Sequence, residues 1–150
     1  MHHNVVDIII HLIRKIRLGQ NLKDIPSEEL HNYNKSELSA AYSWLLQKYG
    51  ASPEDLENKL NTLGNQPSPR ILHYAERMML TKEAYGYLLE LYNLQLIDAL
   101  TLEQIIEQAM LRSLERITLD KIKEIAVTHL FGNAENFTST VYLTGNESIN

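Results

Sequence analysis

The sequence predicts an all-α protein made of two small helical subdomains. Apolar residues recur at three- and four-residue spacing through most of the chain, which is the period of an amphipathic helix. Capping residues, glycines and prolines divide the chain into segments of helical length. The chain has 150 residues, is 44% apolar and has no cysteine. It can therefore bury a core without disulfides, and we expect a cytoplasmic protein from a reducing compartment.

The N-terminal unit, residues 1–64, is predicted to begin with a largely buried helix over residues 5–18. Its many isoleucines also favour strands, but its polar residues share one strip at helical spacing. These polar residues are Asp7, His11, Arg14 and Lys15. The stretch is too charged for a membrane span, and its basic residues follow the apolar run. We therefore expect neither a transmembrane helix nor a secretory signal.

A short second helix and a longer third helix are predicted next. Ser27 precedes two glutamates, so we expect Ser27 to cap a helix over residues 27–33. Asn34 is expected to cap the third helix, which Gly50 ends. This order resembles a helix-turn-helix, whose last helix reads bases in DNA-binding proteins. A tri-helical unit that binds a protein or only packs fits the same pattern, because fold does not settle function.

A fourth helix and a connector complete the first half of the chain. Ser52 and Pro53 are typical of a helix start, and Gly64 is expected to end that helix. The following stretch from Asn65 contains two prolines, two amides and a serine, which indicates a boundary. We assign residues 65–80 to a connector whose second part could be extended.

The C-terminal unit is predicted to hold three helices over residues 81–132. Three threonines precede the helical stretches and are expected to act as N-caps. They are Thr81, Thr101 and Thr118. Gly132 is expected to end the last helix. Residues 133–150 are rich in Asn, Ser and Thr, so we expect a flexible tail there.

The chain shows no motif that concentrates reactive groups. The six histidines never pair at the spacing that puts two metal ligands on one helical turn, and His129 fits a core or interface position. Glycine-rich phosphate loops and nucleophile elbows are absent from the sequence. Glu103 and Glu107 lie one turn apart and could act as paired carboxylates, but the solvated face of a helix explains them as well. We therefore expect no metal, no cofactor and no enzymatic activity.

Several segments resemble the bacterial Smg family, whose biochemical function is unassigned. The matching segments are Val6 to Ile13, Ala41 to Leu45, Arg70 and Ile71, Leu80 to Leu91, Ile122 and Lys123, and Leu130 and Phe131. The similarity covers residues 5–132. Departures include Glu124 in place of Trp, Gly132 in place of Asn, and His129 in an aliphatic run. The family's genes often lie beside one for a DNA-processing protein, which would imply a role near nucleic acid. The resemblance supplies no catalytic residue.

Two functions follow from these observations. The first is a non-enzymatic adaptor that binds another protein, with tyrosines on helices as the partner surface. The candidate tyrosines are Tyr33, Tyr85 and Tyr92, although packing in the core explains tyrosines on helices as well. The second is nucleic-acid binding through cations of the N-terminal unit, although the net charge is −5 and the cations are sparse. The candidate cations are Arg14, Lys15, Arg17, Lys35 and Lys48. Homo-oligomerisation is open in either case.

Overall fold

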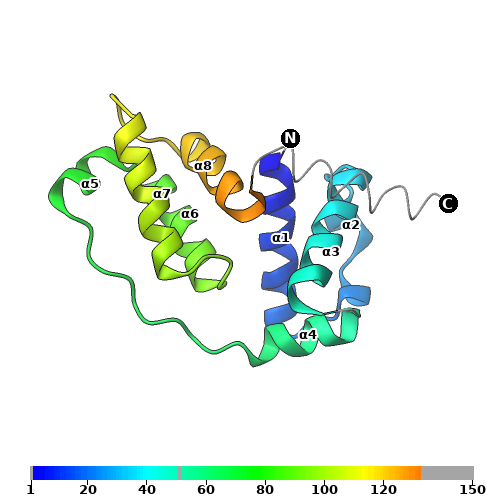
Figure 1. Ribbon diagram of the computed structural model, residues 1–150. Coiled ribbons are helices and arrows are strands. Elements are labelled where there is room, and N and C mark those ends of the chain that lie inside the picture. The colour runs from blue at the N-terminus through cyan, green and yellow to red at the C-terminus, as the bar shows by residue number, and fades with distance from the viewer. Residues whose placement is uncertain (1, 51, 133–150) are drawn as a thin grey trace. The chain divides into compact units, whose positions relative to one another are not determined.

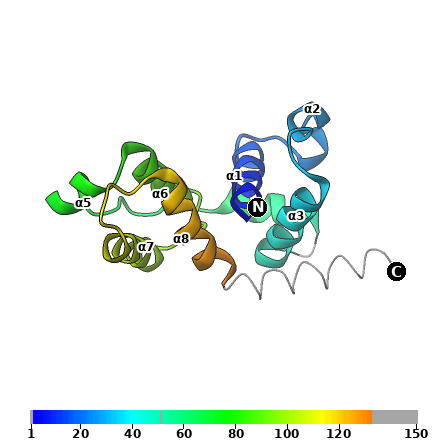
Figure 2. The same ribbon diagram turned by 90° about the horizontal axis from the view of Figure 1, so that it is seen from above.

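A computed structural model describes residues 2–50 and 52–132, and within these ranges every regular element is a helix (Figures 1 and 2). The predicted all-α class is confirmed. The chain divides into two compact units, with the division between Gly64 and Asn65. None of the helices in the described ranges is long and apolar enough to cross a membrane. The tail predicted for residues 133–150 lies outside the described residues.

The N-terminal unit is built around its first helix. Its elements are α1 (His2–Arg17), the 3-10 helix η1 (Leu22–Asp24), α2 (Ser27–Leu30), α3 (Lys35–Tyr49) and α4 (Pro53–Thr62). Helix α1 packs against α3 and α4. Its fully buried residues include Ile9, Leu12, Ile13 and Ile16. The isoleucine-rich stretch is therefore a core helix, as the spacing of its polar strip predicts.

Local side-chain bonds explain most of the boundaries in this unit. Asn34 Oδ1 accepts from the Ser36 N–H at 3.0 Å, and Ser52 Oγ accepts from the Asp55 N–H at 3.2 Å. Both predicted caps are confirmed. The expectation for Ser27 is wrong, because helix α2 begins at Ser27 itself and Pro26 occupies the cap position without a side-chain bond.

The described part of the C-terminal unit, residues 65–132, contains four helices. They are α5 (Tyr74–Met79), α6 (Lys82–Asn93), α7 (Ala99–Arg112) and α8 (Leu119–Phe131). Helix α8 packs against α6 and α7, and α5 packs against α7. The Thr81 and Thr118 caps are confirmed. Gly132 follows α8 with a φ of 73°, a left-handed value that favours glycine.

Helix α5 was not predicted. The sequence did not determine the conformation of residues 70–80, for which an extended segment was one possibility, and in the structure Tyr74–Met79 is helical. Its end is tied to the loop after α7, since the Ile117 N–H donates to the Met79 carbonyl at 2.7 Å and the Thr81 N–H donates to the Ile117 carbonyl at 3.1 Å. A helix of this length is unstable alone, so tertiary contacts must stabilise it.

Helix α7 begins earlier than predicted. Thr101 was expected to be the cap, but Asp98 holds that position, and its Oδ1 accepts from the Thr101 N–H at 2.7 Å. Carboxylates are good caps because they accept this bond and face the positive end of the helix dipole.

Replacing Asp98 by alanine is expected to lower the free energy of unfolding by about 1 kcal/mol, because the cap is lost. Thr101→Ala is the matched control and should change the stability by less than about 0.5 kcal/mol. Urea unfolding followed by circular dichroism measures both variants. A larger loss for Thr101→Ala than for Asp98→Ala would contradict this cap assignment.

Candidate functional site

The connector is fixed to the C-terminal unit by hydrogen bonds. Gln66 Nε2 donates to the carbonyl oxygens of Tyr92 (2.6 Å) and Ile97 (3.1 Å). The Tyr92 hydroxyl donates to the Pro67 carbonyl at 2.7 Å. Tyr92 is only 3% exposed, so its assignment to a partner surface is wrong. Its ring packs in the core, and its hydroxyl holds the connector.

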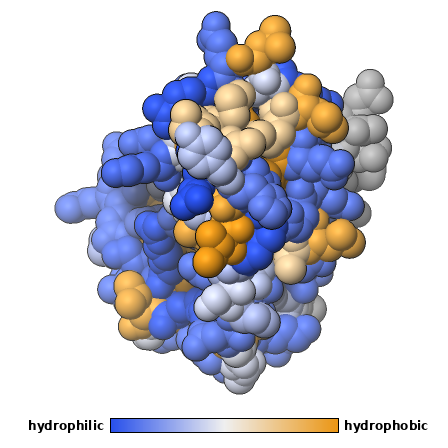
Figure 3. All heavy atoms as spheres, turned by 90° about the vertical axis from the view of Figure 1, so that its left-hand side faces the viewer, coloured by the Kyte–Doolittle hydropathy of each residue, from blue (hydrophilic) through white to orange (hydrophobic). Residues whose placement is uncertain are grey.

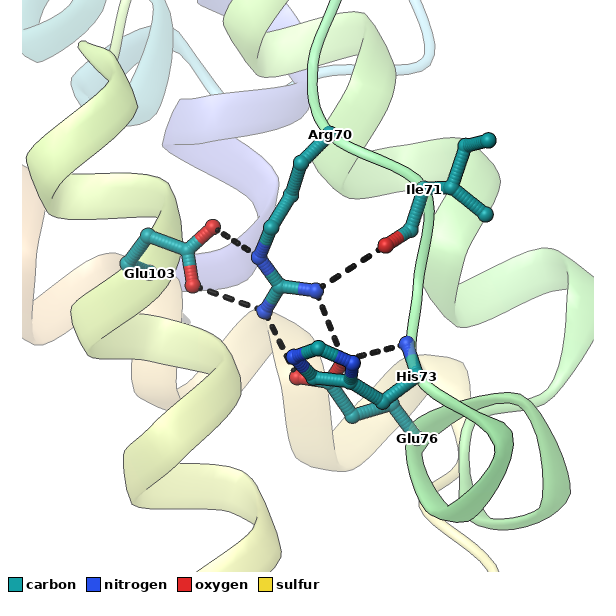
Figure 4. A network of polar contacts seen from close by, with 5 residues as sticks. All are labelled: Arg70, Ile71, His73, Glu76 and Glu103. Carbon is teal, nitrogen blue, oxygen red and sulfur yellow. Dashed lines mark hydrogen bonds and ion pairs between the residues drawn. The ribbon is translucent and has the colours of Figure 1, made fainter.

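Arg70 forms the most extensive polar contact of the connector (Figure 4). Its Nη1 and Nη2 atoms each donate to one oxygen of Glu76 at 2.8 Å. Its Nε and Nη2 atoms donate to the two oxygens of Glu103 at 2.7 and 2.8 Å. We call Arg70, Glu76 and Glu103 the Arg70 cluster. It joins the connector, α5 and α7 through two bidentate pairs, the geometry that makes such bonds strong.

Glu76 is the buried member of the Arg70 cluster. Its side chain is 11% exposed, whereas that of Arg70 is 35% exposed. One Glu76 oxygen also accepts from the His73 N–H at 2.8 Å, at the start of α5. Hydrogen bonding from Arg70 lowers the pKa of Glu76 from 4.5 to about 2, although burial acts in the opposite direction. The carboxylate is therefore charged at neutral pH.

The depressed pKa of Glu76 predicts a loss of stability in acid. A group whose pKa is lower in the folded state stabilises the fold above its unfolded pKa and loses that contribution as the pH falls. The window runs from about pH 4.5 to about pH 2. We expect a loss of about 2 kcal/mol across it, after allowing for solvent at Arg70. Urea unfolding at several pH values measures this. The Glu76→Gln variant should show a flatter dependence, and an equally steep one would contradict the assignment.

The structure gives Glu103 and Glu107 different surroundings. Both oxygens of Glu103 accept from Arg70, so Glu103 belongs to an ion pair. Glu107 is exposed on the same face of α7. Among the residues that the structure describes, there is no group of three His, Asp or Glu side chains placed to hold a metal ion.

Two shallow grooves flank α7. The first, of about 390 Å³, lies between α5 and α7 and is lined by His73, Ala75, Glu76, Glu103, Glu107, Met110 and Leu111. The second, of about 500 Å³, lies on the α8 side and includes Gln108, Arg112 and His129.

Three polar residues of the second groove, Gln108, Arg112 and His129, are hydrogen-bonded to one another. With its amide oriented to suit both neighbours, Gln108 donates to His129 Nε2 at 2.9 Å and accepts from Arg112 Nη2 at 2.9 Å. Burial lowers the pKa of His129, which favours the neutral ring that this bond requires. His129 was expected at a core or interface position. In the structure its side chain is half-buried and contacts Gln108 of α7.

Five large apolar side chains are exposed on the connector, on α5, and on α7 with the loop after it, and one of them, Leu111, lines the first groove. They are Ile71, Tyr74, Met78, Leu111 and Leu114, each at least 58% exposed. We call this set the α5–α7 apolar surface. Figure 3 shows apolar side chains gathered on the face that carries α5, surrounded by hydrophilic ones. In Figure 4 the Ile71 side chain points away from the guanidinium.

The cations predicted for nucleic-acid binding lie at helix ends of the N-terminal unit: Arg14, Lys15 and Arg17 share the last turn of α1, whereas Lys48 and Lys35 lie at opposite ends of α3. Lys15 Nζ lies 3.2 Å from Glu29 Oε1, and that carboxylate also contacts His11 Nε2 at 3.2 Å. The bond from Lys15 lowers the pKa of Glu29. Lys48 Nζ lies 4.9 Å from the Trp44 ring centroid. Lys35 is at the opposite end of α3, about 20 Å away along the helix axis.

The remaining candidate residues differ in exposure. Arg14 is exposed, whereas Arg17 is half-buried. Burial raises the pKa of Tyr49 to about 12, while the charge of Arg17 acts in the opposite direction. Tyr33 and Tyr85 are half-buried, and the Tyr33 ring lies 6.3 Å from the His11 ring.

Comparison with known proteins gives one family. Residues 5–145 match the model of a family described as a protein of unknown function (DUF494). No curated protein and no solved structure matches the chain.

Proposed function

The chain belongs to the DUF494 family, the Smg family of unknown function, and we propose that it is a non-enzymatic adaptor that binds another protein. The single observation that carries the proposal is the α5–α7 apolar surface, with five large exposed side chains. Large apolar side chains exposed on neighbouring segments are typical of interaction sites. Aromatic residues and Met are enriched at protein interfaces, and Tyr74 and Met78 supply them here.

The Arg70 cluster supports the proposal because it fixes the surface before a partner arrives. Arg70 ties the residues before α5 to α7, while Glu76 holds the first turn of α5 through the His73 N–H. A surface that is already ordered loses less conformational entropy on binding.

Nucleic-acid binding through Arg14, Lys15, Arg17, Lys35 and Lys48 is the second candidate. Exposed Arg14 and Lys35 favour it, because phosphate binding needs accessible cations. The ion pair between Lys15 and Glu29 reduces its support. Both candidate functions are proposed for the cytoplasm, as a chain without cysteine suggests.

Affinity capture separates the two candidates. The tagged full chain is incubated with native lysate, with and without nuclease, beside a Met78→Glu/Leu111→Glu variant and a variant with all five cations replaced by Ala. We expect a partner protein that survives nuclease, is lost with the Glu variant and is kept with the Ala variant. Leu18→Glu is the matched control, because Leu18 is 79% exposed in the N-terminal unit.

Recovery that requires nucleic acid and is lost with the Ala variant would contradict the adaptor proposal and support the second candidate. Circular dichroism of each variant establishes that it is folded.

A further inference from the structure

We infer that protonation of His129 reverses the side-chain amide of Gln108 and releases Arg112 from the groove between α7 and α8. Gln108 lies between the other two side chains and is hydrogen-bonded to both. The basis of the inference is the geometry of these three side chains and the donors and acceptors that they carry. The resulting change of conformation with pH does not depend on the proposed adaptor function.

When His129 is neutral, the Gln108 amide satisfies both of its neighbours. The amide nitrogen donates to His129 Nε2 at 2.9 Å, and the amide oxygen accepts from Arg112 Nη1 at 3.1 Å and from Nη2 at 2.9 Å. The opposite orientation would turn the amide nitrogen toward a guanidinium, which has only donors. Arg112 therefore fixes the orientation of the amide, and in that orientation the amide donates to the neutral ring.

The protonated ring of His129 cannot accept this bond. Its Nε2 atom then carries a hydrogen, so two donors would face each other across 2.9 Å. His129 and Gln108 are half-buried, whereas Arg112 is exposed. An unpaired donor costs most where water is excluded, so the exposed guanidinium is the group that gives up its bond. After a half-turn of the amide, Gln108 Oε1 accepts from His129 Nε2 at 2.9 Å.

In the described part of the chain, the charged groups that face His129 come from α7. They are Arg112 and the carboxylate of Glu107, which line the same groove of about 500 Å³. Helix α6 also packs against α8, but its Tyr87 ring lies 5.5 Å from Lys123 Nζ, away from this groove. Burial lowers the pKa of His129 from its usual value of 6.5. The change is therefore expected in mildly acidic solution.

Nuclear magnetic resonance of the full chain between about pH 8 and pH 5 tests the inference. The ring signals of His129 report its protonation, the side-chain NH2 signals of Gln108 report the amide, and the Nε–H signal of Arg112 reports the guanidinium. We expect the three sets of signals to change with one midpoint. A titration of His129 that leaves the Gln108 and Arg112 signals unchanged would overturn the inference.

Two variants identify the group that triggers the change. In His129→Leu, the signals of Gln108 and Arg112 should stay constant over the same pH range. In Glu107→Gln they should still change, because the carboxylate of the groove is not the trigger. Signals that still change in His129→Leu, or that stop changing in Glu107→Gln, would contradict the role of His129.

A double-mutant comparison shows whether Arg112 acts through Gln108. Arg112→Ala leaves the amide free to accept from protonated His129, so the ratio of protonated to neutral His129 at a given pH should rise about threefold or more. Loss of the nearby positive charge also favours the protonated ring directly. Gln108→Met keeps the length of the side chain and its preference for helices but has no amide. In that background Arg112→Ala should therefore raise the ratio less.

An equal rise with and without the amide would overturn the inference, because Arg112 would then act on His129 by its charge alone. Circular dichroism and the urea midpoint establish that each variant is folded. The titration of the unchanged chain tests the inference even where a variant does not fold.

Discussion

Replacing Arg70 by alanine is expected to lower the free energy of unfolding of the C-terminal unit by about 2 kcal/mol. Removing one partner of a buried ion pair leaves the other charge uncompensated, which costs about 3–5 kcal/mol when both partners are fully buried. The Arg70 side chain is partly exposed, so water compensates some of this loss. Glu76 would still accept from the His73 N–H, but it would lose its guanidinium.

Two further variants show whether the loss comes from the Arg70 cluster. Arg70→Lys keeps the positive charge but cannot form two bidentate pairs, so its loss should be intermediate. In Glu76→Gln/Arg70→Ala the buried charge is absent, so the combined loss should be smaller than the sum of the single losses. Urea unfolding measures all of them. Additive losses would contradict direct coupling between Arg70 and Glu76.

Leu88→Ala is expected to cause the largest loss of stability, about 3 kcal/mol within a usual range of 2–5 kcal/mol. Leu88 lies on α6, which packs against α8, and its side chain is fully buried. The substitution removes apolar contacts and leaves a cavity that the surrounding helices can only partly close. The shift of the urea midpoint, together with faster amide hydrogen exchange in α6 and α8, measures the effect.

Leu100→Ala is the matched control for Leu88→Ala. The same atoms are removed, but Leu100 is 67% exposed on α7. Its loss should stay below about 0.5 kcal/mol, as for most surface substitutions. Equal losses for the two variants would contradict the packing described for α6.

The Arg70 cluster gives a physical role to one part of the Smg resemblance. Arg70 and Ile71, just before α5, form one of the segments whose sequence resembles the Smg family. In the structure Arg70 forms both ion pairs, while Ile71 directs its carbonyl toward Arg70 at 3.2 Å and leaves its side chain exposed. One dipeptide thus contributes both to holding α5 and to the α5–α7 apolar surface.

Where the helices begin could mostly be predicted from the sequence. Asn34, Ser52, Thr81 and Thr118 accept from backbone N–H groups two or three residues ahead. A cap of this kind depends only on residues that are close in the chain, so it can be recognised from the amino-acid sequence alone. Asp98 shows the limit, because Thr101 was predicted to be the cap of α7, whereas Asp98, three residues earlier, holds that position in the structure.

The candidate site could not be predicted in the same way. Glu103 was considered as one of two paired carboxylates for acid–base chemistry. Its partner in the structure is Arg70, which lies 33 residues away in the chain and could not be identified from the sequence. Tyr92 was predicted to belong to a partner-binding surface, but packing of the C-terminal unit buries its side chain. Helix α5 is too short for its own sequence to stabilise it, and its contacts with α7 and Arg70 do so instead.

The sequence by itself therefore determined the helical class, most helix starts and the membership of residues 5–145 in the Smg family. These properties depend on apolar spacing and on contacts between residues close in the chain. Only the tertiary structure decided which side chains α7 brings together, which tyrosine is buried and which apolar residues stay exposed beside α5. Such properties depend on the way separate helices pack, because packing places residues side by side that are far apart in the chain.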